Sequence, residues 1–137
     1  MKKTSNGVTI LELLMVLAVV GVLAAIAIPA YQNYLQRAYY NKIVTAMTPF
    51  KDGITECYET THSLNKCDGG SNHVPANITT STGPISSIII TNGVITATPI
   101  ETHGITTTDT YILTPTIVND KLIWVSSGGA VNKGYAN

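Results

Sequence analysis

The sequence predicts an α+β protein in which a long N-terminal helix packs against a small four-stranded antiparallel sheet. Three observations lead to this prediction. An uncharged apolar run opens the chain, an amphipathic helical pattern continues from it, and four short segments rich in Ile, Val and Thr follow in the second half. Four antiparallel strands alone fold poorly, whereas a helix laid on one face supplies the missing core. The 137-residue length fits one domain.

The apolar run covers Val8 to Ala30 and carries a single charge, at Glu12. From Leu13 onward, 18 consecutive residues have neither a charged nor a polar side chain. At about 1.5 Å of rise per residue, a helix of this length crosses a hydrocarbon layer roughly 30 Å thick. We therefore expect this segment to insert into a membrane.

Glu12 is the one charged residue that interrupts this apolar run. A carboxylate in hydrocarbon is costly, so an intramembrane acid normally has a partner. The run contains no basic side chain that could pair with it. The next basic residue, Arg37, is 25 residues further along the chain and too distant to do so. The remaining cation is an α-amino group, which a cut between Gly7 and Val8 would create.

The residues around this junction resemble a known family. A short basic leader ends in Gly7, the pattern V-T-x-x-E runs from Val8 to Glu12, and YQNYLQRA follows at Tyr31 to Ala38. Together they resemble a type IV pilin of the type IVa class, of the major pilin kind. That family most often has phenylalanine where this chain has Val8, but cleavage depends more on the glycine than on the aromatic ring.

The resemblance implies a pilin fold and a leader, residues 1–7, that a prepilin peptidase removes before it methylates the amine of Val8. It implies a structural subunit that self-assembles into a type IV pilus for adhesion and twitching motility, with DNA uptake as a further role. The implied partners are copies of itself, an assembly ATPase, a platform protein and an outer-membrane secretin. The subunit would wait in the inner membrane of a Gram-negative bacterium and end in an extracellular pilus.

Three alternatives remain open. The first is a minor pilin or a type II secretion pseudopilin, which shares the architecture. The second is a DNA-binding subunit. The third is a single-span anchored periplasmic protein or a secretory signal, with Lys2 and Lys3 as the basic region and Ala25–Ala27 as a cleavage site. The apolar run exceeds a signal peptide's usual stretch of about 7–15 residues, and an acid within it suits neither of these.

An amphipathic pattern predicts that the helix continues beyond the apolar run, giving one helix over residues 8–58. Residues 8–30 would form the membrane span and later the filament core, and residues 31–58 would be amphipathic. Gln36 belongs to the expected polar face. The expected apolar face holds Leu35, Tyr39, Ile43, Ala46, Met47, Phe50, Ile54 and Cys57.

Gly21, Pro29 and Pro49 weaken or interrupt helical hydrogen bonding, so kinks or local melting are expected near them. The resemblance implies that Gly21 to Pro29 can unwind in the assembled filament. The alternative is that a proline in a membrane helix only bends it.

Cys57 and Cys67 are the two cysteines of the chain, both on the far side of the membrane segment from the leader. In an oxidising compartment such a pair predicts a disulfide that closes a short loop. With His62 and His73 they also form C-x4-H-x4-C-x5-H, but this spacing matches no usual zinc pattern. A disulfide is therefore preferred to a metal.

Residues 59–84 predict a long polar αβ-loop, rich in Thr, Ser, Asn and Gly, that is functional or mobile. Asn77 begins a weak glycosylation sequon. An antiparallel sheet follows over residues 85–126, with Trp124 as its largest core residue and Pro115 marking a bulge or an edge. The first two expected strands are Ile85–Thr91 and Gly93–Thr98 around an Asn92-Gly93 hairpin turn. The third is a run, Tyr111–Leu113 and Ile117-Val118, that Pro115 breaks, and the fourth is Leu122–Ser126.

The C-terminal loop, residues 127–137, is small and polar. In the resembling family a disulfide commonly fixes this region, but no cysteine follows Cys67. We expect packing and hydrogen bonds to hold it, or mobility, or ordering by a neighbouring subunit. Tyr135 is its only sizeable anchor.

Charge and motifs argue against other functions. Removal of the two leader lysines leaves six basic against eight acidic side chains, a balance of −2. The basic residues are scattered, so nucleic-acid binding is not indicated. No catalytic, cofactor-binding or metal-binding motif is present. We expect surface roles for the histidines and no enzymatic activity, because the remaining acids are isolated: Glu101, Asp109 and Asp120.

Overall fold

The computed structural model describes Gly7 and residues 9–137. Apart from Gly7, the expected leader lies outside the described residues, as does Val8, the expected site of methylation. The chain divides into two compact units, residues 1–34 and residues 35–137. Each unit is described by itself.

Two consecutive helices replace the single helix predicted to end at Tyr58. Helix α1 covers Ile10–Ala46 and α2 covers Thr48–Thr61, with a turn at Met47 between them. Pro49 lies in the first turn of α2. A helix needs no N–H partner there, so the proline that ends α1 is also a favourable start for α2.

Gly21 and Pro29 do not interrupt the described helix. Helix α1 is assigned as α-helical through both residues. A β-carbon added at Gly21 would meet nothing within 4 Å. The unwinding of this segment in an assembled filament therefore stays a prediction.

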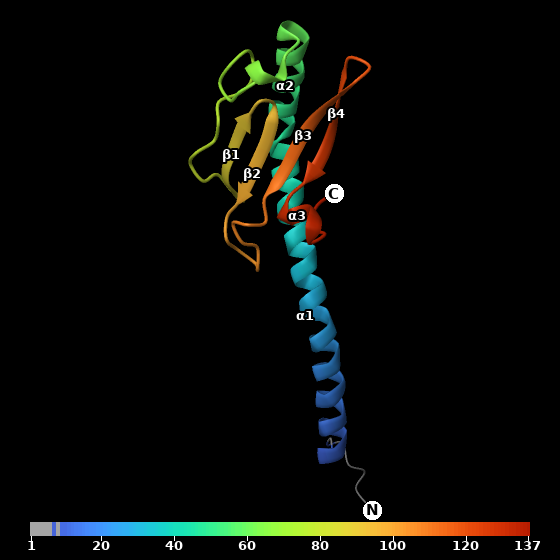
Figure 1. Ribbon diagram of the computed structural model, residues 1–137. Coiled ribbons are helices and arrows are strands. Elements are labelled where there is room, and N and C mark those ends of the chain that lie inside the picture. The colour runs from blue at the N-terminus through green and yellow to red at the C-terminus, as the bar shows by residue number, and fades with distance from the viewer. Residues whose placement is uncertain (1–6, 8) are drawn as a thin grey trace, which may run out of the picture. The chain divides into compact units, whose positions relative to one another are not determined.

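The four predicted strands are present and form an antiparallel sheet in the order β1-β2-β3-β4 (Figure 1). Asn92 and Gly93 have φ values of 51° and 81°, as a two-residue hairpin turn requires. Asn119 and Asp120 adopt φ values of 52° and 62° in the last hairpin. The strands are β1 (Ile85–Thr91), β2 (Val94–Pro99), β3 (Tyr111–Val118) and β4 (Lys121–Ser127).

Pro115 does not break β3, which is continuous and pairs Pro115 with Trp124 of β4. The pairing of β3 with β2 ends at Leu113, which lies opposite Ile95. Pro115 is thus at a local edge on the β2 side. Of the two expectations for Pro115, a bulge or an edge, the structure supports the edge. Proline is tolerated there because one side of the strand is unpaired.

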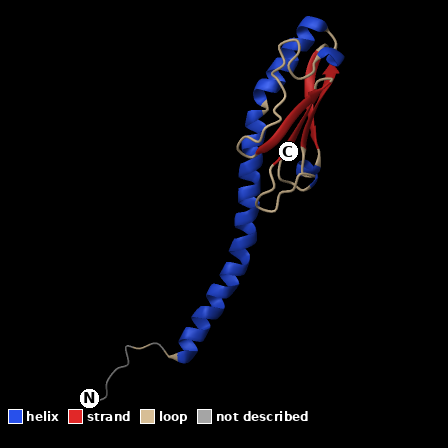
Figure 2. Ribbon diagram, turned by 90° about the vertical axis from the view of Figure 1, so that its left-hand side faces the viewer, coloured by secondary structure: helices blue, strands red, loops and turns tan. Residues whose placement is uncertain are grey.

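The core of the second unit lies between the helices and one face of the sheet (Figure 2). Gly53 of α2 allows close approach of the αβ-loop to the helix, since a β-carbon would lie 2.7 Å from Cδ of Pro75. The buried helix residues include Tyr40, Ile43, Met47, Phe50, Ile54 and Cys57, and the buried strand residues include Ile88, Ile90, Ile95, Ala97, Tyr111 and Leu113.

Two core assignments from the sequence are wrong in detail. The buried stripe starts at Gln36 and Tyr40 instead of Leu35 and Tyr39, because repeated steps of four residues drift around a helix with 3.6 residues per turn. Gln36 tolerates burial because its amide donates to the carbonyl oxygen of His103 at 2.8 Å. Trp124 is only partly buried, and isoleucines fill the centre.

Candidate assembly surface and its supports

The first unit exposes an apolar helix surface. The large apolar side chains from Ile10 to Ile28 have exposed fractions between 54% and 79%. Among the described residues, only the helical stretch Ile10–Thr61 is long and apolar enough to cross a membrane, judged by length and composition. A surface of this kind needs lipid or protein around it.

Glu12 takes part in a capping box at the start of α1. Its backbone N–H donates to Thr9 Oγ1 at 3.2 Å, and its carboxylate accepts from the backbone N–H of Thr9 at 3.4 Å. The carboxylate also lies where the helix dipole favours a negative charge. Glu12 therefore has a local hydrogen-bond partner within its own chain, and its pairing with an amine stays a prediction.

The predicted disulfide joins Cys57 and Cys67, whose Cα atoms lie 5.9 Å apart. Both sulfur atoms are used in this bond, so they cannot ligate a metal. His62 and His73 are both exposed at the surface, and Nδ1 of His73 lies 4.0 Å from Oε1 of Glu56. Within the described residues there is no group of three or more side chains suited to a metal ion.

The αβ-loop covers the outer edge of β1. Ile78 exchanges two backbone hydrogen bonds of 2.9 Å with Ile88. Asn77 Oδ1 accepts from the backbone N–H of Ile90 at 2.9 Å, and Asp68 Oδ1 accepts from that of Asn92 at 2.8 Å. The side chain of the Asn77 sequon therefore has a structural role.

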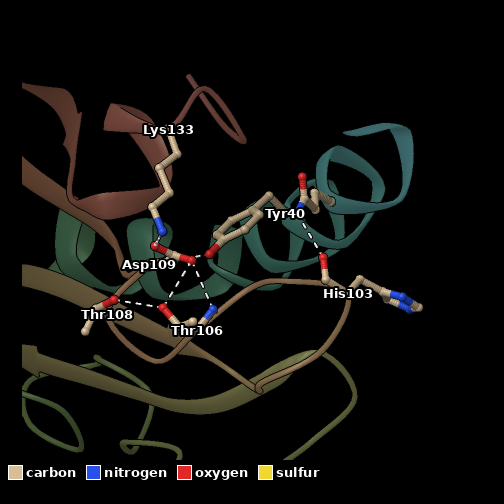
Figure 3. A network of polar contacts seen from close by, with 7 residues as sticks. Tyr40, His103, Thr106, Thr108, Asp109 and Lys133 are labelled. Atoms are coloured by element: carbon tan, nitrogen blue, oxygen red, sulfur yellow. Dashed lines mark hydrogen bonds and ion pairs between the residues drawn. The ribbon is translucent and has the colours of Figure 1, made fainter. Parts of the chain in front are cut away.

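A buried carboxylate anchors the C-terminal segment (Figure 3). Asp109, in the loop before β3, has a side chain only 1% exposed, and its Oδ1 lies 2.6 Å from Nζ of Lys133. Its Oδ2 accepts from the backbone N–H and the hydroxyl of Thr106, at 3.0 and 3.3 Å. The Tyr40 hydroxyl donates to the carbonyl oxygen of Asp109. One residue thus connects α1 to the C-terminal segment.

The pKa values of this network agree with an ion pair. Burial raises the pKa of Asp109, but the hydrogen bonds from Lys133 and Thr106 outweigh it and hold that pKa below its ordinary value. The hydrogen bond to Asp109 raises the pKa of Lys133. Burial raises the pKa of Tyr40, so its hydroxyl keeps its proton.

Packing completes the attachment of the C-terminal segment, which begins with the short helix α3 (Gly129–Asn132). Ala130 is fully buried, and the Tyr135 ring stacks on Tyr40 with centroids 5.6 Å apart. The Tyr111 hydroxyl donates to the carbonyl oxygen of Asn137 at 2.8 Å. Of the three expected alternatives, packing and hydrogen bonds hold this segment.

Comparison with known proteins decides the family. Residues 2–28 match a model described as the prokaryotic N-terminal methylation motif. Prepilin peptidase-dependent protein D of Escherichia coli K12 is 36% identical over 93 residues, covering 68% of this chain and 62% of that protein. The type IV major pilin protein PilE of Neisseria gonorrhoeae is 35% identical over 98 residues, covering 72% and 58%. The solution NMR structure of the major type IV pilin PpdD from enterohemorrhagic Escherichia coli superposes with a TM-score of 0.55 at 25% identity, over 70% of each chain.

The chain belongs to the type IV pilin family. It spans 62% and 58% of the length of the two curated relatives. The long helix and the four-stranded antiparallel sheet are those of the pilin structure that it matches. The family, the fold and the disulfide predicted from the sequence are thus confirmed.

Two features of this pilin escaped the sequence prediction. The first is the capping box of Thr9 and Glu12. The sequence contains its pattern, because Thr-x-x-Glu stands directly before an apolar run. Asp109 gave no signal, because its partner Lys133 is 24 residues away and no local pattern connects the two. Only the fold brings these two residues together.

Proposed function

We propose that this pilin is the structural subunit of a type IV pilus. The chain is cleaved after Gly7, the new amine of Val8 is methylated, and the helix leaves the membrane for the apolar centre of a filament. The observation that supports this most is the exposed apolar surface from Ile10 to Ile28. Its burial continues from lipid to filament, so the transfer need not oppose assembly strongly.

Glu12 gives the growing filament its register in this proposal. A buried charge without a counter-ion is strongly destabilising. The hydrogen bond from the Thr9 N–H, at 3.4 Å, relieves Glu12 in part. The amine of Val8 on a neighbouring subunit supplies the missing positive charge, and a head-to-tail contact of this kind repeats into an open filament.

The cellular partners follow from the same proposal. A prepilin peptidase cuts and methylates the chain, and an assembly ATPase, a platform protein and a secretin build and export the filament. Before assembly the subunit waits in the inner membrane. Tyr31 and Tyr34, 63% and 68% exposed, lie just past the apolar run, where aromatic side chains favour the membrane interface. Residues 60–84 and 126–137 are candidates for the adhesive surface.

Two measurements test the proposal. Electron microscopy of cells that carry the assembly machinery should show thin filaments only when this chain is produced. Mass spectrometry of sheared filaments should find this chain as the main component, starting at Val8 with one added methyl group. A start at Met1 or after Ala27 contradicts the proposal in favour of an anchored or secreted protein. A trace amount in the filaments contradicts the major role in favour of a minor pilin or pseudopilin.

A further inference from the structure

The two edges of the sheet differ in how they are covered. On the β1 edge, the outward N–H and C=O groups of Ile88 bond to Ile78, each at 2.9 Å. The N–H of Ile90 donates to Asn77 Oδ1 at 2.9 Å, and its C=O accepts from the N–H of Gly69 at 3.2 Å. The αβ-loop therefore satisfies this edge and closes it to other strands.

No described residue covers the β4 edge in this way. In an antiparallel sheet, alternate residues of a strand bond to opposite neighbours. Because Ile88 and Ile90 face away from β2, the register across the sheet makes Leu122, Trp124 and Ser126 the residues whose N–H and C=O groups face away from β3. In the described part of the chain, no group beyond the strand ladder bonds to these N–H and C=O groups. Figure 1 shows β4 at the margin of the sheet.

Strand β4 also lacks the usual protection of an exposed edge. Natural edge strands are shortened, bent by bulges, or carry prolines and central charges. Strand β4 pairs with β3 over all seven residues without a register shift, and its only charge, Lys121, is at one end. On the solvent face Ile123 and Val125 are 49% and 52% exposed. The strand is therefore suited to pair with another strand.

We propose that the β4 edge pairs antiparallel with the β4 edge of a second copy and joins two pili side by side. The proposal rests on the proposed filament function. Trp124 is the middle residue of the strand, so a register centred on it pairs all seven residues. Ile123 then lies opposite Val125 of the other copy, and Lys121 lies opposite Ser127. No like charges meet, and the exposed apolar pair is buried.

Such a contact differs from the one that lengthens the filament. It uses the same surface on both copies, so it closes on itself and adds no further subunits. One pair of edge strands is marginal in water. A filament repeats the edge many times along its length, however, and many weak contacts in parallel give stable association. The expected consequence is bundling of pili.

Cysteine capture tests the register. Filaments of an Ile123→Cys chain and filaments of a Val125→Cys chain are grown separately, mixed and oxidised. Opposed residues in this register have Cα atoms about 4.5–5.5 Å apart, within disulfide reach. We expect a disulfide-linked dimer in the mixture and none in either sample alone, where the cysteines of two copies are diagonal neighbours. Cys57 and Cys67 do not interfere, because they are bonded to each other.

The matched control places the same pair of substitutions on the covered edge. Ile89→Cys and Thr91→Cys lie on the solvent face of β1, two residues apart, and their mixture should give no dimer. Intact filaments without a dimer in the β4 mixture overturn the proposal. Dimers that form only when both β4 variants are produced in one cell place the contact within one filament and also overturn it. If no filaments form, the full-length chains are concentrated in detergent, mixed and held under oxidising conditions, so that the disulfide accumulates even from a weak single pairing. This arm tests the pairing separately from the proposed function. The dimer is expected there too, and its absence overturns the pairing.

Discussion

Removal of the Cys57–Cys67 disulfide should destabilise the second unit by about 3 kcal/mol. The bond closes a loop over a sequence separation of 10, and the chain-entropy relation gives about that value for such a loop. For a unit of roughly 100 residues this corresponds to a fall in Tm of about 12 to 24 °C. The loss should begin at the αβ-loop, because Cys67 accepts a backbone hydrogen bond from Gly93 at 2.9 Å.

The assay uses the full-length chain in detergent, with Cys57→Ala and Cys67→Ala together so that no free thiol remains. Trp124 is the only tryptophan in the sequence, so its fluorescence follows the sheet during thermal or denaturant unfolding. Hydrogen exchange should show that the amide of Ile90, which donates to Asn77, loses protection. Chemical reduction of the unsubstituted chain is the control. A loss below 1 kcal/mol, or unchanged exchange at Ile90, would refute the reasoning.

Three further predictions concern the other supports. Asp109→Asn should flatten the acid end of the pH–stability curve: the folded pKa of Asp109 is lowered, so its stabilisation is present above its ordinary pKa and is lost as the pH falls through the lowered value. Equal acid sensitivity in both chains, measured by circular dichroism, would contradict this. Tyr40→Phe leaves the buried carbonyl of Asp109 without its hydroxyl donor and should lower the free energy of unfolding, measured with denaturant, by about 1 kcal/mol. An unchanged free energy of unfolding would mean that this hydrogen bond does not stabilise the fold. Thr9→Val removes the capping hydroxyl and should lower the filament yield, while Thr9→Ser should restore it; equal yields would mean that the cap is dispensable.

Local patterns predicted most of the fold. The apolar run gave α1, and the Asn92-Gly93 pair gave the first hairpin, because a two-residue turn with positive φ at both positions favours few other sequences. The segments rich in Ile, Val and Thr predicted the strands, β1 with its observed bounds. These features depend on neighbours in the sequence, so they can be derived without a structure.

The predictions that failed concern residues whose environment depends on contacts with distant parts of the chain. Gln36 looks polar and exposed until the fold brings the His103 carbonyl within 2.8 Å. Trp124 looks like a core residue, but β4 is the last strand of the sheet and the side chain is only partly buried. The attachment of the C-terminal segment needed Asp109 and Lys133 to meet, which no local pattern indicates.

The most direct test of the account compares Glu12→Gln with Glu12→Ala in cells that carry the assembly machinery. Glutamine at this position can still complete the capping box with Thr9 but carries no charge. Filaments are counted by electron microscopy and their subunit register is measured. We expect both variants to lose most filaments, because the amine of the neighbouring subunit needs a carboxylate. Normal numbers of filaments with an unchanged register from Glu12→Gln would contradict it.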